Sequence, residues 1–173
     1  FYLHRYFYYE TSILKRINAF IEKEADFFDE RKVALKEQTS FIQTLFESKE
    51  QQTNWQLVAA LTSILYNFSI ITGGPGTGKT TTVAKLLAVL YKLHPDLKVA
   101  LAAPTGKAAA RMNESLQKSK DNLAGLSDEI KEKYEHIAAG TIHRLLGTIR
   151  DSPYFKHNTE NQLHFDVVII DES

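Results

Sequence analysis

The segment Gly73–Thr80 contains the residues with the clearest chemistry in this sequence. It reads GGPGTGKT and matches the phosphate-loop pattern G-x-x-x-x-G-K-[ST]. Glycines allow the backbone to turn its N–H groups toward phosphate oxygens, and the N-terminus of a following helix adds partial positive charge. Lys79 would contact the β and γ phosphates of ATP, and the Thr80 hydroxyl can ligate Mg²⁺. An unused glycine turn is the alternative, but a strand-like run before the motif and a helix after it favour nucleotide binding. The predicted nucleotide-binding residues are Gly73, Gly74, Pro75, Gly76, Thr77, Gly78, Lys79, Thr80 and Thr81.

A second candidate catalytic segment, Val167–Glu172, ends the sequence as an apolar run followed by two acids. The run is typical of a parallel strand buried on both faces, which would deliver its acids to the carboxyl edge of a sheet. Asp171 would hold Mg²⁺ directly or through water, and Glu172 would orient and deprotonate the attacking water. Alone this pattern is ambiguous, but together with the phosphate loop it indicates a Walker B strand. Lys79 and Glu172 are therefore the expected catalytic residues.

The segment Ala103–Arg111 contains another Gly-Lys pair but does not predict a second nucleotide site. It lacks the upstream glycines, and Ala108 stands where a Mg²⁺-binding hydroxyl is needed. A helix that begins near Thr105, with Lys107 and Arg111 beside its start, is suited to a phosphate of a nucleic-acid backbone. A strand-to-helix turn with solvated charges is the alternative interpretation.

The string Gly140–Leu146 is a weaker signal for nucleic-acid contact. Thr141 at a helix start, His143 and Arg144 could touch a DNA strand, although a single histidine is more often a structural residue. The remaining histidines show no metal-ligand spacing.

Strands that alternate with helices position these motifs, which indicates an α/β fold with a parallel sheet. A helix is expected from about Lys79 to Leu93, ended by His94-Pro95-Asp96, and a charged helical insertion or mobile loop at 118–135. Further expected strands are 68–72, 97–103 and 165–170, and further expected helices begin near Trp55, Gly106 and Thr141.

Residues 1 to about 50 predict a helical segment without catalytic residues. One apolar helix face is expected from Ile13 to Ile21 and another from Phe41 to Phe46, with a polar linker at Ser48–Thr53. The alternating charges between the two faces are typical of solvated surface. A helical cap or docking module is the expected role.

Composition narrows the class of protein. The formal net charge is zero, so any contact with nucleic acid must be local. The absence of cysteine excludes disulfides and suits a reducing cytoplasm. No apolar run approaches the roughly 20 residues of a membrane helix. The sequence starts with Phe1 and stops just after a strand-like run, so we interpret it as a fragment.

The motifs occur in one order that closely resembles the RecD family, the helicase subunits of RecBCD-type enzymes (exonuclease V). The resemblance rests on GGPGTGKTTT, APTGKAAAR, TIHRLLG and DVVIIDE across roughly residues 52–173, with YLHRY at residues 2–6 and Glu10 as a less specific entry. It implies a superfamily 1 motor that hydrolyses ATP and moves 5′ to 3′ on single-stranded DNA during double-strand break repair. It also implies a docking segment at 1–50, a first RecA-like domain at 51–173, and RecB- and RecC-like partners.

The same resemblance assigns roles to individual residues. Gln56 matches the position of a glutamine that reads adenine, and the remaining matches concern DNA. The implied DNA-contacting residues are Pro104, Thr105, Lys107, Arg111, Thr141 and His143. No nuclease is expected in this chain, because the family places it in a different subunit.

This sequence departs from the family pattern after Ser173. The later helicase motifs, the second RecA-like domain and the arginines that complete the ATP site do not follow. We therefore expect weak nucleotide binding and no unwinding by this segment alone. A scaffold that binds ATP and DNA without turnover remains an alternative, which Asp171 and Glu172 argue against. A phosphate-loop ATPase acting on protein is another, which the two candidate DNA motifs argue against.

Overall fold

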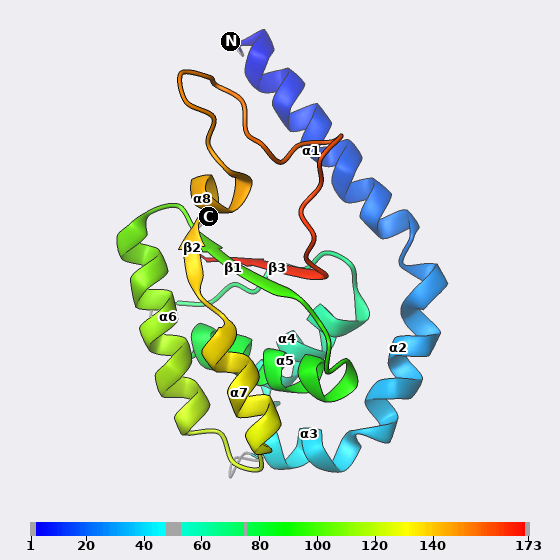
Figure 1. The fold of residues 1–173 in the computed structure, drawn as a ribbon. Helices are drawn as coiled ribbons and strands as arrows, with labels where there is room; N and C mark the ends of the chain where they lie inside the picture. Colours follow the sequence, from blue (N-terminus) through cyan, green and yellow to red (C-terminus); the bar gives the residue numbers. More distant parts are fainter. Residues whose placement is uncertain (1–2, 48–52, 75, 172–173) are drawn as a thin grey trace. The chain divides into compact units, whose positions relative to one another are not determined.

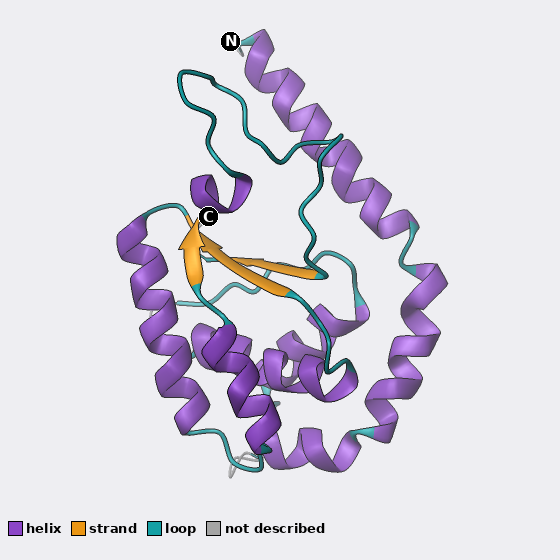
Figure 2. Cartoon of the chain, viewed as in Figure 1, coloured by secondary structure: helices purple, strands orange, loops and turns teal. Residues whose placement is uncertain are grey.

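A computed structural model describes residues 3–47, 53–74 and 76–171 of the chain. These residues divide into two compact units, Phe1–Thr82 and Val83–Ser173. The first unit is mainly helical, and the second combines a small parallel sheet with helices (Figure 1, Figure 2). The α/β class with a parallel sheet and N-terminal helices is therefore confirmed.

Helices make up most of the described part of the first unit. They are α1 (His4–Glu22), α2 (Ala25–Glu37), α3 (Thr39–Leu45) and α4 (Trp55–Leu65). The helical character expected for the first 50 residues is confirmed for the described residues 4–45, with α2 as an additional element. No residue of α1 is buried, so its apolar face, which includes Leu14 and Phe20, is exposed in this structure. The expected linker lies outside the described residues except for Thr53.

Side chains define both ends of α4. Its start is set by Asn54, whose Oδ1 accepts a hydrogen bond of 3.0 Å from the Leu57 N–H. At its other end, the guanidinium of Arg31 in α2 donates to the carbonyl oxygen of Leu65 at 3.1 Å. The carbonyls in the last turn of a helix lack partners within the helix, so this bond stabilises the end of α4.

The expected strand at 68–72 is not formed. The segment between α4 and the phosphate loop has no ladder pairing within its unit, and the Ile70 side chain is 78% exposed. A strand is defined by hydrogen bonds to a neighbour, which a short apolar run does not specify by itself. The expectation of a buried strand here is therefore wrong.

The second unit is built around a three-stranded parallel sheet with strand order β2-β1-β3. Its strands are β1 (Val99–Ala103), β2 (Ala139–Thr141) and β3 (Val167–Ile170). Ala103 of β1 is in register with Thr141, and Ala102 is in register with Ile170. All three strands therefore end at one carboxyl edge.

The helices from the phosphate loop onward are α5 (Lys79–Leu93), α6 (Gly106–Asp121), α7 (Asp128–His136) and α8 (Ile142–Leu146). Of these, α6 follows β1 and α8 follows β2. The bounds of α5 match the predicted helix, which begins at the phosphate loop and continues into the second unit. Ala108 and Ala109 of α6 pack with Ala103 of β1, and their small side chains allow the helix to approach the strand closely. No helix of the described ranges is long and apolar enough to span a membrane.

Strand β3 differs from the prediction that it is buried on both faces. Its residues alternate between half-buried and exposed, with Val168 at 41% and Ile170 at 47% exposure. β3 is the last strand of the order β2-β1-β3 and pairs with β1. Consecutive side chains of a strand point to opposite faces, so only one face of β3 is covered.

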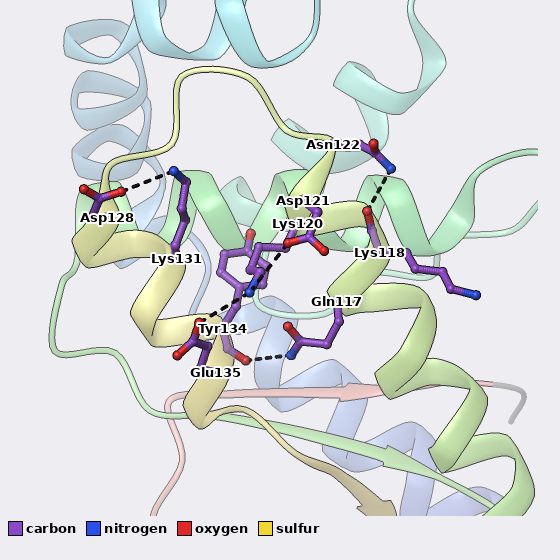
Figure 3. Close-up of polar contacts among 9 residues, drawn as sticks. All are labelled: Gln117, Lys118, Lys120, Asp121, Asn122, Asp128, Lys131, Tyr134 and Glu135. Carbon is purple, nitrogen blue, oxygen red and sulfur yellow. Dashed lines mark hydrogen bonds and ion pairs between the residues drawn. The ribbon is translucent and has the colours of Figure 1, made fainter.

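The charged region 118–135 is a helical hairpin and not an open loop. The end of α6 is joined by a short turn to α7, which Ser127 caps by accepting a hydrogen bond of 3.4 Å from the Ile130 N–H. The Lys120 ammonium lies 3.6 Å from the Glu135 carboxylate, which joins the two helices (Figure 3). Of the two expected forms, the structure therefore shows the helical insertion.

Candidate functional site

The backbone of the phosphate loop has the conformation that its glycines allow. Gly76 and Gly78 have φ angles of +74° and +82°, in the left-handed region that other residues rarely adopt. A Cβ at Gly73 would lie 2.6 Å from the Thr77 hydroxyl oxygen, so a side chain there would collide with the loop itself. The loop therefore needs glycine for local reasons, and these are the features expected of a phosphate cradle.

Lys79 stands at the first position of α5 and folds back along the loop. Its Nζ donates to the carbonyl oxygens of Gly73 at 2.7 Å and of Gly74 at 3.1 Å. The Thr77 hydroxyl donates to the Gly74 carbonyl as well, at 2.9 Å. These bonds hold the lysine ammonium beside the helix N-terminus, where positive charge from both would act on an anion. The residues present therefore fit a nucleotide phosphate.

Gln56 lies against the same loop. Its Nε2 donates to the Thr77 carbonyl oxygen at 3.4 Å, and a Cβ at Gly78 would lie only 2.5 Å from that nitrogen. The position of Gln56 in the first turn of α4 brings this amide beside the phosphate loop. The structure thus brings together two groups that the sequence places far apart, although the role of Gln56 in reading adenine stays a prediction.

Three other candidate segments meet at the carboxyl edge of the sheet in the second unit. Thr105 follows β1, Thr141 ends β2, and Asp171 follows β3. The Asp171 N–H donates to the Ala102 carbonyl oxygen at 3.0 Å, which continues the β1–β3 pairing to the acid itself. Ligands of parallel sheets bind at this edge, so the placement is suitable for a binding site.

Both threonines at this edge cap helices. The Thr105 hydroxyl accepts from the Ala108 N–H at 3.2 Å, and the Thr141 hydroxyl accepts from the Arg144 N–H at 3.1 Å. These are ordinary N-cap bonds, which support the structural interpretation of the threonines. A hydroxyl has one donor and two acceptor lone pairs, however, so a capping threonine can still donate to a phosphate oxygen.

Two basic residues lie in the first turns of α6, next to this edge of the sheet. Lys107 and Arg111 are exposed and one helical turn apart, so they share a face of α6 near its N-terminus. Pro104, also exposed, precedes the helix in the turn. This geometry fits a phosphate contact and is equally compatible with solvated charges.

His143 is exposed and packs against an aromatic residue that the sequence did not indicate. Its ring lies 5.6 Å from the Phe155 ring in an edge-on arrangement, and Phe155 pairs with Thr148 in an antiparallel bridge. The local hairpin therefore holds one side of the imidazole. No spacing in the sequence could have identified this contact, because it depends on the path of the loop after α8.

Two predicted site residues, Pro75 and Glu172, lie outside the described residues. The other predicted residues fall in both units. Gln56 and the phosphate loop belong to Phe1–Thr82, whereas the DNA candidates and Asp171 belong to Val83–Ser173.

Comparisons with known proteins give one consistent result. A family described as an AAA domain matches residues 56–173. The chain is 44% identical to the RecBCD enzyme subunit RecD of Haemophilus influenzae over 140 residues, which cover 76% of this chain and 21% of that protein. It is 33% identical to the subunit RecD of Buchnera aphidicola subsp. Schizaphis graminum over 173 residues, covering 99% of this chain and 27% of that protein.

A helicase outside the RecBCD subunits is also similar. The ATP-dependent RecD2 DNA helicase of Deinococcus radiodurans is 36% identical over 103 residues, which cover 60% of this chain and 11% of that protein. The chain thus spans between about a tenth and about a quarter of the length of these relatives. The similar region includes the phosphate loop, but most of the length of each relative lies outside it.

Proposed function

Because the chain belongs to the AAA-domain family and its AAA domain is RecD-like, we propose that it forms the ATP-binding part of a DNA helicase. The helicase would move 5′ to 3′ on single-stranded DNA. The observation that carries the proposal is the phosphate loop, with left-handed Gly76 and Gly78 and with Lys79 at the start of α5. An AAA domain with such a loop is a nucleotide-binding domain, and ATP with Mg²⁺ is the proposed ligand.

The proposed chemistry is phosphoryl transfer from ATP to water. Lys79 would stabilise charge on the transferred phosphate, and Gln56 would select the adenine. Thr80 and Asp171 would serve the Mg²⁺ ion, which neutralises charge that develops on the phosphates. Glu172 would orient the attacking water and accept its proton. The support for these roles is the residue types in motif order, together with the local geometry of the phosphate loop.

The proposed DNA contacts lie at the carboxyl edge of the sheet and on α6. Lys107 and Arg111 would neutralise phosphates of the DNA backbone. The Pro104–Thr105 turn would bring the DNA strand to the N-terminus of α6. Thr141 at the end of β2 and His143 in α8 would contact the same DNA strand, and the parallel pairing of β2 with β1 supports this. A chain with zero net charge can bind DNA in this way because only the local charge matters.

We also propose that the protein works in a larger assembly. Relatives named as RecBCD enzyme subunits support RecB- and RecC-like partners and a role in double-strand break processing. Such a complex would act on DNA in the cytoplasm, with its nuclease in another subunit. Helicase activity is proposed for the full-length protein in this assembly.

The test is ATP turnover by the protein at the full length of its relatives, with and without single-stranded DNA. Lys79→Ala should lower the DNA-stimulated rate by roughly 10² or more, because a full charge on the transferred phosphate is lost. Lys32→Ala, an exposed lysine of α2, is the matched control and should leave the rate unchanged. Near-normal turnover by Lys79→Ala would remove the basis of the proposal.

The same assay separates the alternatives. ATP binding without turnover would indicate a scaffold. Turnover that does not respond to DNA would indicate a phosphate-loop ATPase of another class.

A further inference from the structure

Helix α7 carries mostly charged residues, but its Tyr134 is fully buried. The side chain of Tyr134 ends in a polar hydroxyl group. Its relative exposure is 0%, and its hydroxyl donates a hydrogen bond to the carbonyl oxygen of Ala84 in α5. Burial, and secondarily Tyr91, raises the pKa of Tyr134, so the hydroxyl keeps its proton and remains a donor. A core position alone would accept phenylalanine, whereas a buried hydroxyl requires a partner.

The bond reaches α5 close to the phosphate loop. Ala84 lies one helical turn after Thr80, and Ala88 and Tyr91 continue the same face of α5 at the spacing of further turns. The Tyr91 ring lies 6.1 Å from the Tyr134 ring in an edge-on arrangement. The Tyr134 side chain therefore contacts the face of α5 that carries Ala84 and Tyr91.

The backbone of the same residue is tied to α6. The Gln117 Nε2 in α6 donates to the Tyr134 carbonyl oxygen at 3.0 Å, one turn before the Lys120–Glu135 ion pair (Figure 3). Lys120 is only 12% exposed, so this pair is partly shielded from water. Helix α6 starts at Gly106, directly after the Pro104–Thr105 turn. One residue thus bonds both the helix that follows the phosphate loop and the helix that carries the candidate DNA contacts.

We propose that Tyr134 is a positioning residue that makes the placement of α5 depend on α6, and so links DNA contact at Pro104–Arg111 to ATP turnover. This inference rests on the proposed function. A packed helix transmits displacement as a body, because protein interiors are close-packed. A shift of α6 on DNA binding would therefore reach α5 through Gln117, Tyr134 and Ala84. Tyr134 does not touch the nucleotide in this scheme.

The test is Tyr134→Phe, which removes only the hydroxyl, in the full-length protein with its partner subunits. The DNA-stimulated kcat should fall about fivefold, the effect expected when one hydrogen bond no longer contributes to the activated state. The kcat without DNA, the KM for ATP and the Kd for single-stranded oligonucleotide should each stay within about twofold of wild type. Tyr91→Phe is the matched control, because it removes a buried tyrosine hydroxyl from the same contact and leaves the Tyr134–Ala84 bond.

Several outcomes would overturn the inference. Equal loss of the basal and the stimulated rate would make Tyr134 a packing residue, and unchanged stimulation would show that the bond transmits nothing. If Tyr134→Phe does not fold, Gln117→Ala breaks the link on its α6 side at a half-buried position. It should reduce stimulation in the same selective way, and wild-type stimulation in that variant would also refute the link.

The experiment gives a different result if the proposed DNA-motor function itself is wrong. A wild-type protein that turns over ATP without any response to DNA would refute both the DNA motor and this inference. A wild type that DNA stimulates, together with a Tyr134→Phe protein that DNA stimulates equally, would refute the inference alone.

Discussion

At Gly78, the local structure depends on the absence of a side chain in two ways. The φ angle of +82° strains any residue with a Cβ, and the Gln56 amide occupies the place where that Cβ would lie. The amide is the end of a flexible side chain and can move aside, so the backbone strain is the larger obstacle. Moving it would nevertheless break the Gln56–Thr77 bond beside the proposed nucleotide site.

Gly78→Ala should therefore weaken nucleotide binding and lower stability by about 1 kcal/mol, the cost of a left-handed alanine. Gly106→Ala is the matched control, because a Cβ at Gly106 meets nothing within 4 Å. That variant should be neutral or slightly stabilising, since alanine favours a helix more than glycine does. Fluorescent-nucleotide titration and urea unfolding would measure both effects. Equal nucleotide affinity in the two variants would contradict the account of this loop.

The proposed role of Glu172 in activating water rests on the sequence. Glu172→Gln should preserve nucleotide affinity and lower the hydrolysis rate by roughly 10² to 10⁴, because an amide can hold water but cannot accept its proton. Single-turnover hydrolysis and nucleotide titration of the same protein would separate the two effects. A parallel loss of affinity would indicate a structural carboxylate instead.

At the scale of elements, the first turn of α6 decides between a DNA contact and a solvated turn. Lys107 and Arg111 share an exposed face, and the Thr105 cap leaves the hydroxyl proton available. Each phosphate neutralised on single-stranded DNA contributes a slope of roughly −0.7 to the plot of log affinity against log salt. A solvated turn contributes no such slope. The salt dependence therefore distinguishes the two interpretations without a structure of the complex.

Lys107→Ala or Arg111→Ala should weaken binding to single-stranded DNA similarly for all sequences and make the slope shallower by roughly 0.7. Affinity for ATP in the absence of DNA should hardly change. Salt titrations of an oligonucleotide complex, beside nucleotide titrations, would measure both, with Lys36→Ala on α2 as an exposed control. A fixed slope with a collapse of nucleotide affinity would assign this turn to the ATP site.

Elements with a strong local signal were predictable from the sequence. Helix α5 begins and ends at the predicted residues, because a glycine-rich turn precedes it and His94-Pro95 follows. The structure of segment 68–72 was not predictable, because the pairing of a β-strand depends on a partner strand and not on the apolar run. Strand β2 was missed since Ala-Gly-Thr has neither β-branched repetition nor alternation, and its pairing with β1 creates it.

The candidate site was predictable to a similar degree. The phosphate loop and the acid after β3 follow from residue type and spacing. The position of Gln56 followed only from the family resemblance, and its contact with Thr77 depends on the direction of α4. The Tyr134 contact had no signal at all, because a single tyrosine among charged residues looks like solvated surface until α7 packs on α5.

At the scale of the molecule, ionisable groups buried in one unit make its stability depend on pH. Burial raises the pKa of Tyr91 to about 12, and it raises the pKa of Tyr134 in the same direction. Both residues belong to the unit Val83–Ser173. An unfolded chain would ionise these tyrosines near pH 10, so alkaline conditions favour unfolding of this unit. The first unit contains neither residue.

The sign of the effect follows from linkage. A group whose pKa is higher in the folded state contributes its full stability below the unfolded pKa near 10, and that contribution is lost as the pH rises toward 12. For Tyr91 alone the free energy of unfolding should fall by about 1.4 kcal/mol per pH unit in this window. Urea unfolding followed by circular dichroism at pH 8, 10 and about 11 would measure the fall.

Tyr91→Phe should make this alkaline fall shallower, because one of the two buried phenols can no longer ionise. Tyr154→Phe is the matched control in the same unit, since Tyr154 is 75% exposed and should not alter the dependence. Tyrosinate absorbance recorded in the same titration should show the buried phenols ionising together with unfolding and not before it. If Tyr91→Phe and Tyr154→Phe lose stability as steeply as wild type, burial of Tyr91 does not govern the alkaline limit of this unit.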